Sequence, residues 1–156
     1  MSALYDPVIL FHARSEKNRG EVEEPRLRGR GFNPACGDEI FLSLRIEGER
    51  ISHGAWTGEG CAVCLASASL AVEGVRGLDR QEALDKIRAF YRFVGDETNS
   101  PGPDLDPAAW SWGEAAALKP AFRLPGRKDC VLLAWRTLEG LIAGPAAETG
   151  PAQAGD

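Results

Sequence analysis

The spacing of apolar residues changes along the chain, and it predicts a strand region followed by helices. From residue 39 to residue 47 every second position is apolar, which is typical of a strand with one buried face. A turn at Glu47–Arg50 leads to a second predicted strand, Ile51–Thr57, so the two strands form an antiparallel hairpin. Residues 15–31 are polar and contain three glycines, which predicts a loop, although part of Arg28–Phe32 can add a third strand.

Apolar residues at helical spacing predict five helices: Leu4–Phe11, Cys61–Glu73, Ala83–Val94, Ala108–Leu118 and Asp129–Ile142. Asp79, with Glu82 three residues later, predicts a cap before the third helix. The last helix is amphipathic, and its predicted buried residues are Val131, Leu132, Trp135, Leu138 and Ile142. The expected fold class is therefore α+β, with a small three-stranded antiparallel sheet covered by helices.

Length, composition and charge limit the classes of protein to which the chain can belong. The 156 residues, 44% hydrophobic and 26% charged, fit a single globular domain over residues 1–144. Residues 145–156 are rich in Ala, Gly and Pro without periodicity, so we expect a disordered tail there. The net charge of −5 argues against a nucleic-acid partner. The sequence has neither an apolar run long enough for a bilayer nor a secretion signal, so we expect a cytoplasmic protein without a membrane partner.

The cysteines carry the strongest chemical signal. In a reducing cytoplasm, four cysteines favour metal ligands or reactive thiols over structural disulfides. Cys36 lies in the turn Asn33–Asp38, where Gly37 allows the backbone to bend so that Cys36 and Asp38 can reach one cation. Cys61 and Cys130 each open a predicted helix, where the helix dipole favours a thiolate.

These residues predict a metal site if the fold brings them together. Three thiolates and one carboxylate (Cys36, Cys61, Cys130 and Asp38) form a closed tetrahedral zinc site or a softer, exchangeable iron site. The carboxylate is the weaker ligand beside thiolates, so Asp38 is the ligand that a substrate most easily displaces. The alternative for Asp38 is a turn cap.

Other candidate residues have ordinary structural explanations. Cys61 and Cys64 match a Cys-x-x-Cys pair, which is either redox-active or part of a four-cysteine zinc site, but Cys64 lies on an Ala-rich face that favours the core. Asp129 is either a ligand or, as we expect, an N-cap of the last helix. We expect His12 and His53 to be structural, and the Trp110–Trp112 pair to pack rather than bind a cofactor.

Three motifs in this order resemble the U-type iron–sulfur assembly proteins, the IscU and SufU family. They are Asn-Pro-Ala-Cys-Gly-Asp at 33–38, Gly-x-Gly-Cys-x-x-x-x-Ala-Ser-Ala-Ser at 58–69, and Arg-x-x-Cys followed by Leu-Ala-Trp at 127–135. The resemblance covers residues 5–141. An extra segment at 95–119 and the Leu-Ala-Trp sequence favour the SufU branch. Asp129 stands where IscU-like proteins have a histidine ligand, and residues 124–128 differ from the segment that IscU-like proteins use to recruit a chaperone.

This resemblance implies a function as well as a fold. It implies a zinc ion held by Cys36, Asp38, Cys61 and Cys130, and a Cys36 thiol that accepts sulfur from a SufS-like, pyridoxal-phosphate-dependent cysteine desulfurase. Apo iron–sulfur proteins or the SUF assembly complex are the implied next acceptors. The alternative, as in IscU-like proteins, is a scaffold that carries a [2Fe–2S] cluster on the same residues. A third hypothesis, from a different class, is a thiol–disulfide module that uses Cys61 and Cys64.

Overall fold

A computed structural model describes residues 6–25, 27–96 and 106–144 of the chain. Its sheet has three antiparallel strands in the order β1-β2-β3, which are Leu27–Asn33, Asp38–Glu47 and Arg50–Glu59. Both expected hairpin strands are present, and each is longer than the sequence indicated. The predicted α+β class with a three-stranded antiparallel sheet is confirmed.

Strand β1 confirms the third strand predicted within Arg28–Phe32 and corrects the expectation of a loop that extends to Gly31. Its buried face includes Gly29 and Gly31, and helix α5, Lys128–Ala143, packs directly against these glycines. A Cβ atom at Gly31 would lie 2.3 Å from Thr137 Oγ1, so only glycine permits this close approach. Because the two central buried positions of the strand are glycines, the alternation that predicts a strand is weak in this segment.

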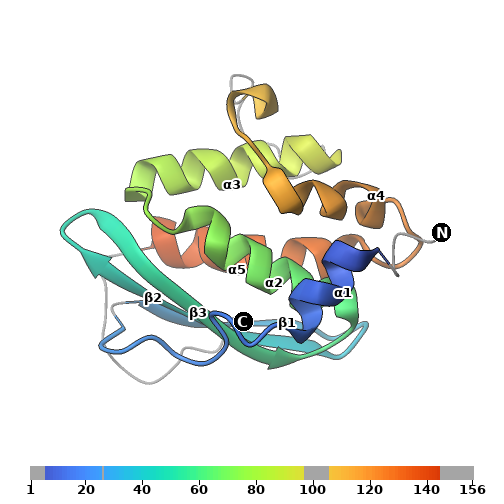
Figure 1. The fold of residues 1–156 in the computed structure, drawn as a ribbon, viewed down its shortest axis with the longest axis horizontal. Coiled ribbons are helices and arrows are strands. Elements are labelled where there is room, and N and C mark those ends of the chain that lie inside the picture. Colours follow the sequence, from blue (N-terminus) through green and yellow to red (C-terminus); the bar gives the residue numbers. More distant parts are fainter. Residues whose placement is uncertain (1–5, 26, 97–105, 145–156) are drawn as a thin grey trace.

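The remaining helices are α1 Pro7–Arg14, α2 Ala62–Val75, α3 Arg80–Val94 and α4 Leu118–Phe122, with short 3₁₀ segments η2 Pro107–Ala109 and η3 Gly113–Ala117. All the helices among the described residues lie on one side of the sheet (Figure 1). Helices α2 and α5 contact the strands, α1 packs against α2, and α3 and α4 lie beyond α2 and α5.

Two helix starts follow local capping chemistry. Helix α1 begins at Pro7 rather than at Leu4, because Asp6 caps it by accepting the Val8 N–H at 2.8 Å, and proline suits the first helical position. Leu4 lies outside the described residues. The cap predicted at Asp79 is confirmed: Asp79 accepts the Glu82 N–H at 2.8 Å, and the Glu82 carboxylate accepts the Asp79 N–H at 3.0 Å.

The prediction of one helix over Ala108–Leu118 is wrong. This segment forms η2 and η3, and Leu118 begins α4. The two 3₁₀ segments are separated after Trp110, whose backbone is extended (φ −117°, ψ 145°), and η3 begins at Gly113, which has a φ of +52°. Trp112 stacks on Phe93 with ring centroids 4.9 Å apart, which confirms its predicted packing role. Residues 97–105, within the predicted 95–119 insertion, lie outside the described residues, as does the predicted tail 145–156.

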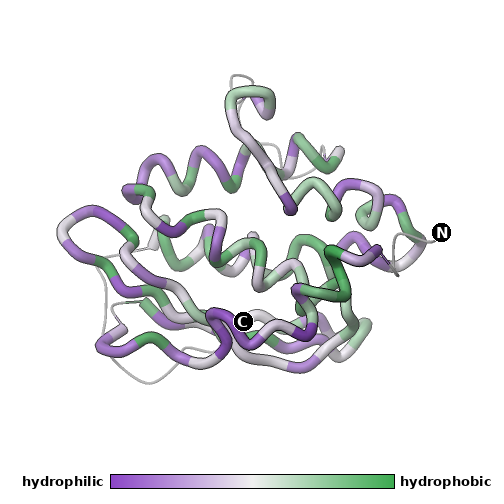
Figure 2. The backbone as a smooth tube through the Cα atoms, viewed as in Figure 1, coloured by the Kyte–Doolittle hydropathy of each residue, from purple (hydrophilic) through white to green (hydrophobic). Residues whose placement is uncertain are grey.

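The core lies between the sheet and the two helical layers. All five residues predicted on the buried side of the last helix are buried, and Trp135 among them stacks on Phe90 with centroids 3.8 Å apart. Figure 2 shows hydrophilic and hydrophobic residues mixed along α3, as expected of a helix with one face on the core and one in solvent. None of the described helices combines the length and the apolar character needed to cross a membrane.

Candidate metal and sulfur site

The turn between β1 and β2 presents Cys36 at one end of the sheet. The Asn33 carbonyl accepts hydrogen bonds from the backbone N–H of Cys36 at 3.3 Å and of Gly37 at 2.8 Å. Gly37 has a φ of +75°, which glycine adopts without strain. The turn leaves Cys36 exposed and places Asp38, the first residue of β2, in the interior with 1% of its surface accessible.

Two helix starts bring the other thiols to the same place. Cys61 is the N-cap residue of α2, and Cys130 lies in the first turn of α5. Both positions match the prediction that these cysteines open helices, where the helix dipole stabilises negative charge on sulfur. Cys61 is half-buried and Cys130 is fully buried.

Three of the four predicted ligands form a tight cluster. Three ligand atoms lie within 4.8 Å of one another: Cys36 Sγ, Cys130 Sγ and one carboxylate oxygen of Asp38. The Cys130 thiol donates to Asp38 Oδ2 at 3.0 Å and lies 3.8 Å from Cys36 Sγ. The fold therefore joins residues that are 92 and 94 positions apart in the sequence.

Cys61 lies next to this cluster, but it is not one of the three residues whose ligand atoms are all within 4.8 Å of one another. Its side chain hydrogen-bonds to Cys130, and its backbone N–H donates to Asp38 Oδ1 at 3.2 Å. The fourth predicted ligand is thus in contact with two of the other three.

The contacts among these side chains shift the pKa values of Cys61 and Cys130 in opposite directions. The hydrogen bond from Cys130 lowers the pKa of Cys61 to about 6, although burial opposes the shift. That same bond, together with burial and the bond to Asp38, raises the pKa of Cys130. A negative charge is therefore favoured on Cys61 while Cys130 keeps its proton.

The residues fit a cation. Cys130 has one S–H proton for three acceptors, and no described Lys, Arg or His lies within ion-pair distance of the buried Asp38 carboxylate. Buried charge without a partner is costly, and a bound cation compensates it. Sulfur donors with one oxygen donor suit zinc, and thiolates also suit iron–sulfur clusters.

Gly58 and Gly60, which were not among the predicted site residues, lie where a side chain would collide with β2. A Cβ atom at Gly60 would lie 2.6 Å from Asp38 Oδ1, and one at Gly58 would lie 2.2 Å from the Glu39 carbonyl oxygen. Both glycines precede Cys61 in the Gly-x-Gly-Cys motif, so the motif itself was the available signal. The absence of a side chain at Gly60 lets the start of α2 approach Asp38 of β2, and its absence at Gly58 lets β3 approach β2.

The other candidates lie outside the cluster. Cys64 is a core residue with 1% of its surface accessible, as expected, and burial raises the pKa of its thiol. Asp129 is neither a ligand in the cluster nor the N-cap, which is Arg127; it is exposed and pairs with Arg136 at 3.1 Å. The capping expectation fails because α5 begins at Lys128, so Asp129 lies inside the first turn of the helix.

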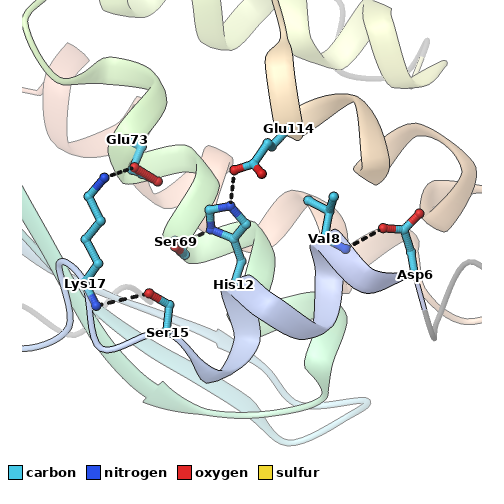
Figure 3. Close-up of polar contacts among 8 residues, drawn as sticks. All are labelled: Asp6, Val8, His12, Ser15, Lys17, Ser69, Glu73 and Glu114. Carbon is cyan, nitrogen blue, oxygen red and sulfur yellow. Dashed lines mark hydrogen bonds and ion pairs between the residues drawn. The ribbon is translucent and has the colours of Figure 1, made fainter.

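Both histidines have contacts away from the thiols. His12 is buried, and its ring nitrogens lie 2.9 Å from Ser69 Oγ and 2.8 Å from Glu114 Oε1 (Figure 3). His53 is exposed on β3, next to Ser52. These contacts agree with the structural role expected for the two residues.

The fold and the cluster together define a small α+β protein with a candidate cysteine–aspartate metal centre at one end of its sheet. Residues 4–117 match the family described as "NifU-like N terminal domain". The chain belongs to this family, in agreement with the motif resemblance.

Named relatives and a solved structure are similar over most of the chain. The chain is 29% identical to the "zinc-dependent sulfurtransferase SufU" of Bacillus subtilis, over 92% of each protein. It is 31% identical to the "iron-sulfur cluster assembly scaffold protein IscU" of Streptococcus pyogenes, over 91% of this chain and 84% of the relative. A crystal structure of a putative SUF-system scaffold protein from Fervidobacterium islandicum superposes with a TM-score of 0.70 at 29% identity, covering 89% of this chain and 96% of the other.

Proposed function

We propose that this protein works in iron–sulfur cluster assembly as a zinc-dependent acceptor of persulfide sulfur. In this proposal Cys36 is the accepting thiol, and Cys36, Asp38, Cys61 and Cys130 hold the zinc ion. The SufU relative is named a zinc-dependent sulfurtransferase, and its similarity spans nearly the whole chain. The extra segment at 95–119, which we propose is part of one domain over residues 1–144, is a further SufU-like feature.

The observation that carries this proposal is the convergence of two sulfurs and one carboxylate oxygen within 4.8 Å, with one sulfur exposed. Cys130 and Asp38 are buried, so a large partner cannot reach them. Cys36 projects from a surface turn, where the persulfide of another protein can meet it. The cluster thus combines a buried anchoring part with one accessible nucleophile.

Bound zinc keeps coordinating thiols deprotonated at neutral pH. The chain's own residues define the reaction. The Cys36 thiolate attacks the outer sulfur of the donor persulfide; a new sulfur–sulfur bond forms on Cys36, the donor's sulfur–sulfur bond breaks, and the donor leaves as a thiolate. Asp38 and Cys130 stay in place beneath Cys36, because β2 and α5 hold them.

The proposed donor is a pyridoxal-phosphate-dependent cysteine desulfurase of the SufS type. The proposed next acceptors are apo iron–sulfur proteins or a SUF assembly complex. Both assignments rest on the resemblance to the SufU and IscU family. The names of the relatives support only sulfur transfer and iron–sulfur cluster assembly in general. The net charge of −5 gives no support to a nucleic-acid partner.

A second candidate function is a scaffold that carries a [2Fe–2S] cluster on the same residues. The relatives named as IscU scaffolds, from Streptococcus pyogenes and Thermotoga maritima, favour it. Anaerobic purification followed by metal analysis and a visible spectrum separates the two functions. One zinc in a colourless protein supports sulfur acceptance, and two irons in a brown protein support the scaffold. A redox function of Cys61 with Cys64 has little support, because Cys64 is buried with a raised pKa.

Replacing Cys36 tests the acceptor role. A cysteine desulfurase turning over cysteine releases alanine faster when its persulfide is removed, so wild-type protein should stimulate alanine release. Cys36→Ser should abolish this stimulation, while Cys64→Ala, which changes a buried cysteine outside the cluster, should keep most of it. Full stimulation by Cys36→Ser would show that another residue accepts the sulfur. Circular dichroism verifies that both variants fold.

A further inference from the structure

A cavity lies between the helical layers, away from the thiols. Its volume is about 210 Å³, and its walls come from α2, α3, η3 and α5, with Leu70, Glu73, Lys86, Trp112, Glu114 and Trp135 among the lining residues. Leu70 is nine residues beyond Cys61 on α2, which corresponds to about 14 Å along the helix. The cavity is therefore separate from the candidate metal site.

Lys86 supplies a cation to this cavity. Its ammonium group donates to the Gly74 carbonyl at 2.9 Å and lies over the ring of Trp110, 5.6 Å from the centroid, and 6.0 Å from that of Trp112. No carboxylate of the described residues lies within ion-pair distance of Lys86. Burial lowers the pKa of Lys86, as expected for a desolvated cation without an anionic partner. An anion bound in the cavity would supply the anionic partner that Lys86 lacks among the described residues.

The cavity also presents two acceptors. Glu73 and Glu114 line it, and each carboxylate already has a basic partner: Lys17 lies 3.0 Å from one Glu73 oxygen, and His12 lies 2.8 Å from one Glu114 oxygen (Figure 3). The second oxygen of each carboxylate receives no hydrogen bond from a described residue. These oxygens remain available to an ammonium group of a ligand.

We propose that this cavity binds a small free α-amino acid. The ligand's carboxylate would pair with Lys86, its ammonium group would donate to Glu73 or Glu114, and its side chain would contact Leu70 and the indole of Trp112. Drug-sized ligands occupy pockets of about 300–1,000 Å³, so this smaller cavity selects a compact molecule. The inference does not depend on the proposed sulfur chemistry, because none of these residues belongs to the cysteine cluster.

Binding is measured on the full-length protein by isothermal titration calorimetry, with L-alanine as the probe. Tryptophan fluorescence provides a second signal, because Trp112 lines the cavity. Saturable L-alanine binding with a Kd of about 10 mM or tighter is the expected result. Propionate, which lacks the ammonium group, and ethylamine, which lacks the carboxylate, should each bind at least about tenfold more weakly.

Matched lysine variants locate the binding. Lys86→Met should weaken L-alanine binding at least about tenfold. Lys119→Met should leave it unchanged, because Lys119 also lies over an aromatic ring, Phe93 at 5.1 Å, but does not line the cavity. Thermal unfolding verifies that both variants fold. Absence of binding across the twenty L-amino acids, equal binding by Lys86→Met, or equal binding of propionate would each overturn the proposal.

Discussion

The Asp38 carboxylate is held from two directions. Its Oδ1 accepts the backbone N–H of Cys61 and its Oδ2 accepts the thiol of Cys130, so both oxygens face the starts of helices. A carboxylate fixed in this way loses little further freedom when it binds a cation. Asp38 therefore does more than cap a turn: it connects β2 to the start of α2 through the Cys61 backbone N–H and to the start of α5 through the Cys130 thiol.

Removing this carboxylate should weaken metal binding more than it harms the fold. We expect Asp38→Ala to lower zinc affinity by a factor of about 10–100 or more, since loss of a supporting group around a metal already costs that much. Competition with a chromophoric chelator measures the affinity. Asp129→Ala is the matched control, because Asp129 is an exposed acid next to Cys130 in the sequence that pairs with Arg136 instead. Equal zinc affinity in the two variants would remove Asp38 from the ligand set.

Gly60 should be sensitive to a single added methyl group. In Gly60→Ala the new Cβ atom would lie 2.6 Å from Asp38 Oδ1, so the carboxylate or the start of α2 must move. We expect a loss of about 1–3 kcal/mol in the free energy of unfolding, together with weaker zinc binding.

Gly140→Ala is the control for this substitution. Gly140 lies in α5 with open space where its Cβ atom would be, so alanine should raise the free energy of unfolding by about 0.5–1 kcal/mol. Urea unfolding measures both variants. Unchanged stability and zinc affinity in Gly60→Ala would show that the contact with Asp38 relaxes freely.

Part of the arrangement of the candidate site can be predicted from the sequence. Cys36, Asp38 and Cys130 were predicted ligands because their turn and helix-start positions are local features, and the structure brings them together. The position of Cys61 at the border of the cluster and the space required at Gly60 depend on how β2 meets α2, which no local pattern contains.

Local chemistry determines several boundaries of the elements. The cap of α3 joins Asp79 and Glu82 through two reciprocal hydrogen bonds, and the left-handed Gly95, with a φ of +99°, ends the helix. These signals lie within a few residues of each boundary. For this reason the cap of α3 was predictable from the sequence.

The cap of α3 gives a stability prediction. Asp79→Ala should lower the free energy of unfolding by about 1 kcal/mol, because the Glu82 N–H loses its acceptor. For a chain of this length that loss corresponds to a decrease of about 2–4 °C in Tm. Asp85→Ala, on the same helix, removes only an exposed contact with Gln81 and should change stability by less than about 0.5 kcal/mol. Differential scanning calorimetry compares the two, and equal Tm values would indicate that the cap contributes nothing.

Elements whose form depends on distant partners were predicted less well. Strand β1 carries glycines where a typical strand has apolar side chains, because α5 occupies the space above them. The segment after residue 106 forms separate short turns, whose conformation follows from Trp112 packing on Phe93 of α3. In both cases tertiary packing overrides the local preference.

Across the whole molecule, His12 joins three elements that are far apart in the sequence. It extends from α1, bonds to Ser69 on α2 and pairs with Glu114 of η3, across 57 and 102 residues (Figure 3). The imidazole is buried while the Glu114 side chain is 61% exposed. This arrangement links the N-terminal helix and the segment after residue 106 to α2, the central helix that Cys61 caps.

A double-mutant cycle tests this connection. His12→Ala should cost about 1–3 kcal/mol or more, because it leaves the buried Ser69 hydroxyl without its partner and creates a small cavity. Glu114→Ala alone should cost less than about 1 kcal/mol, because its carboxylate is largely exposed and solvent screens the pair. The double variant should lose at least about 0.5 kcal/mol less than the sum of the losses in the two single variants, since the second substitution removes a contact that the first has already removed. Urea unfolding gives all four free energies, and additive losses would mean that η3 is held in place without His12.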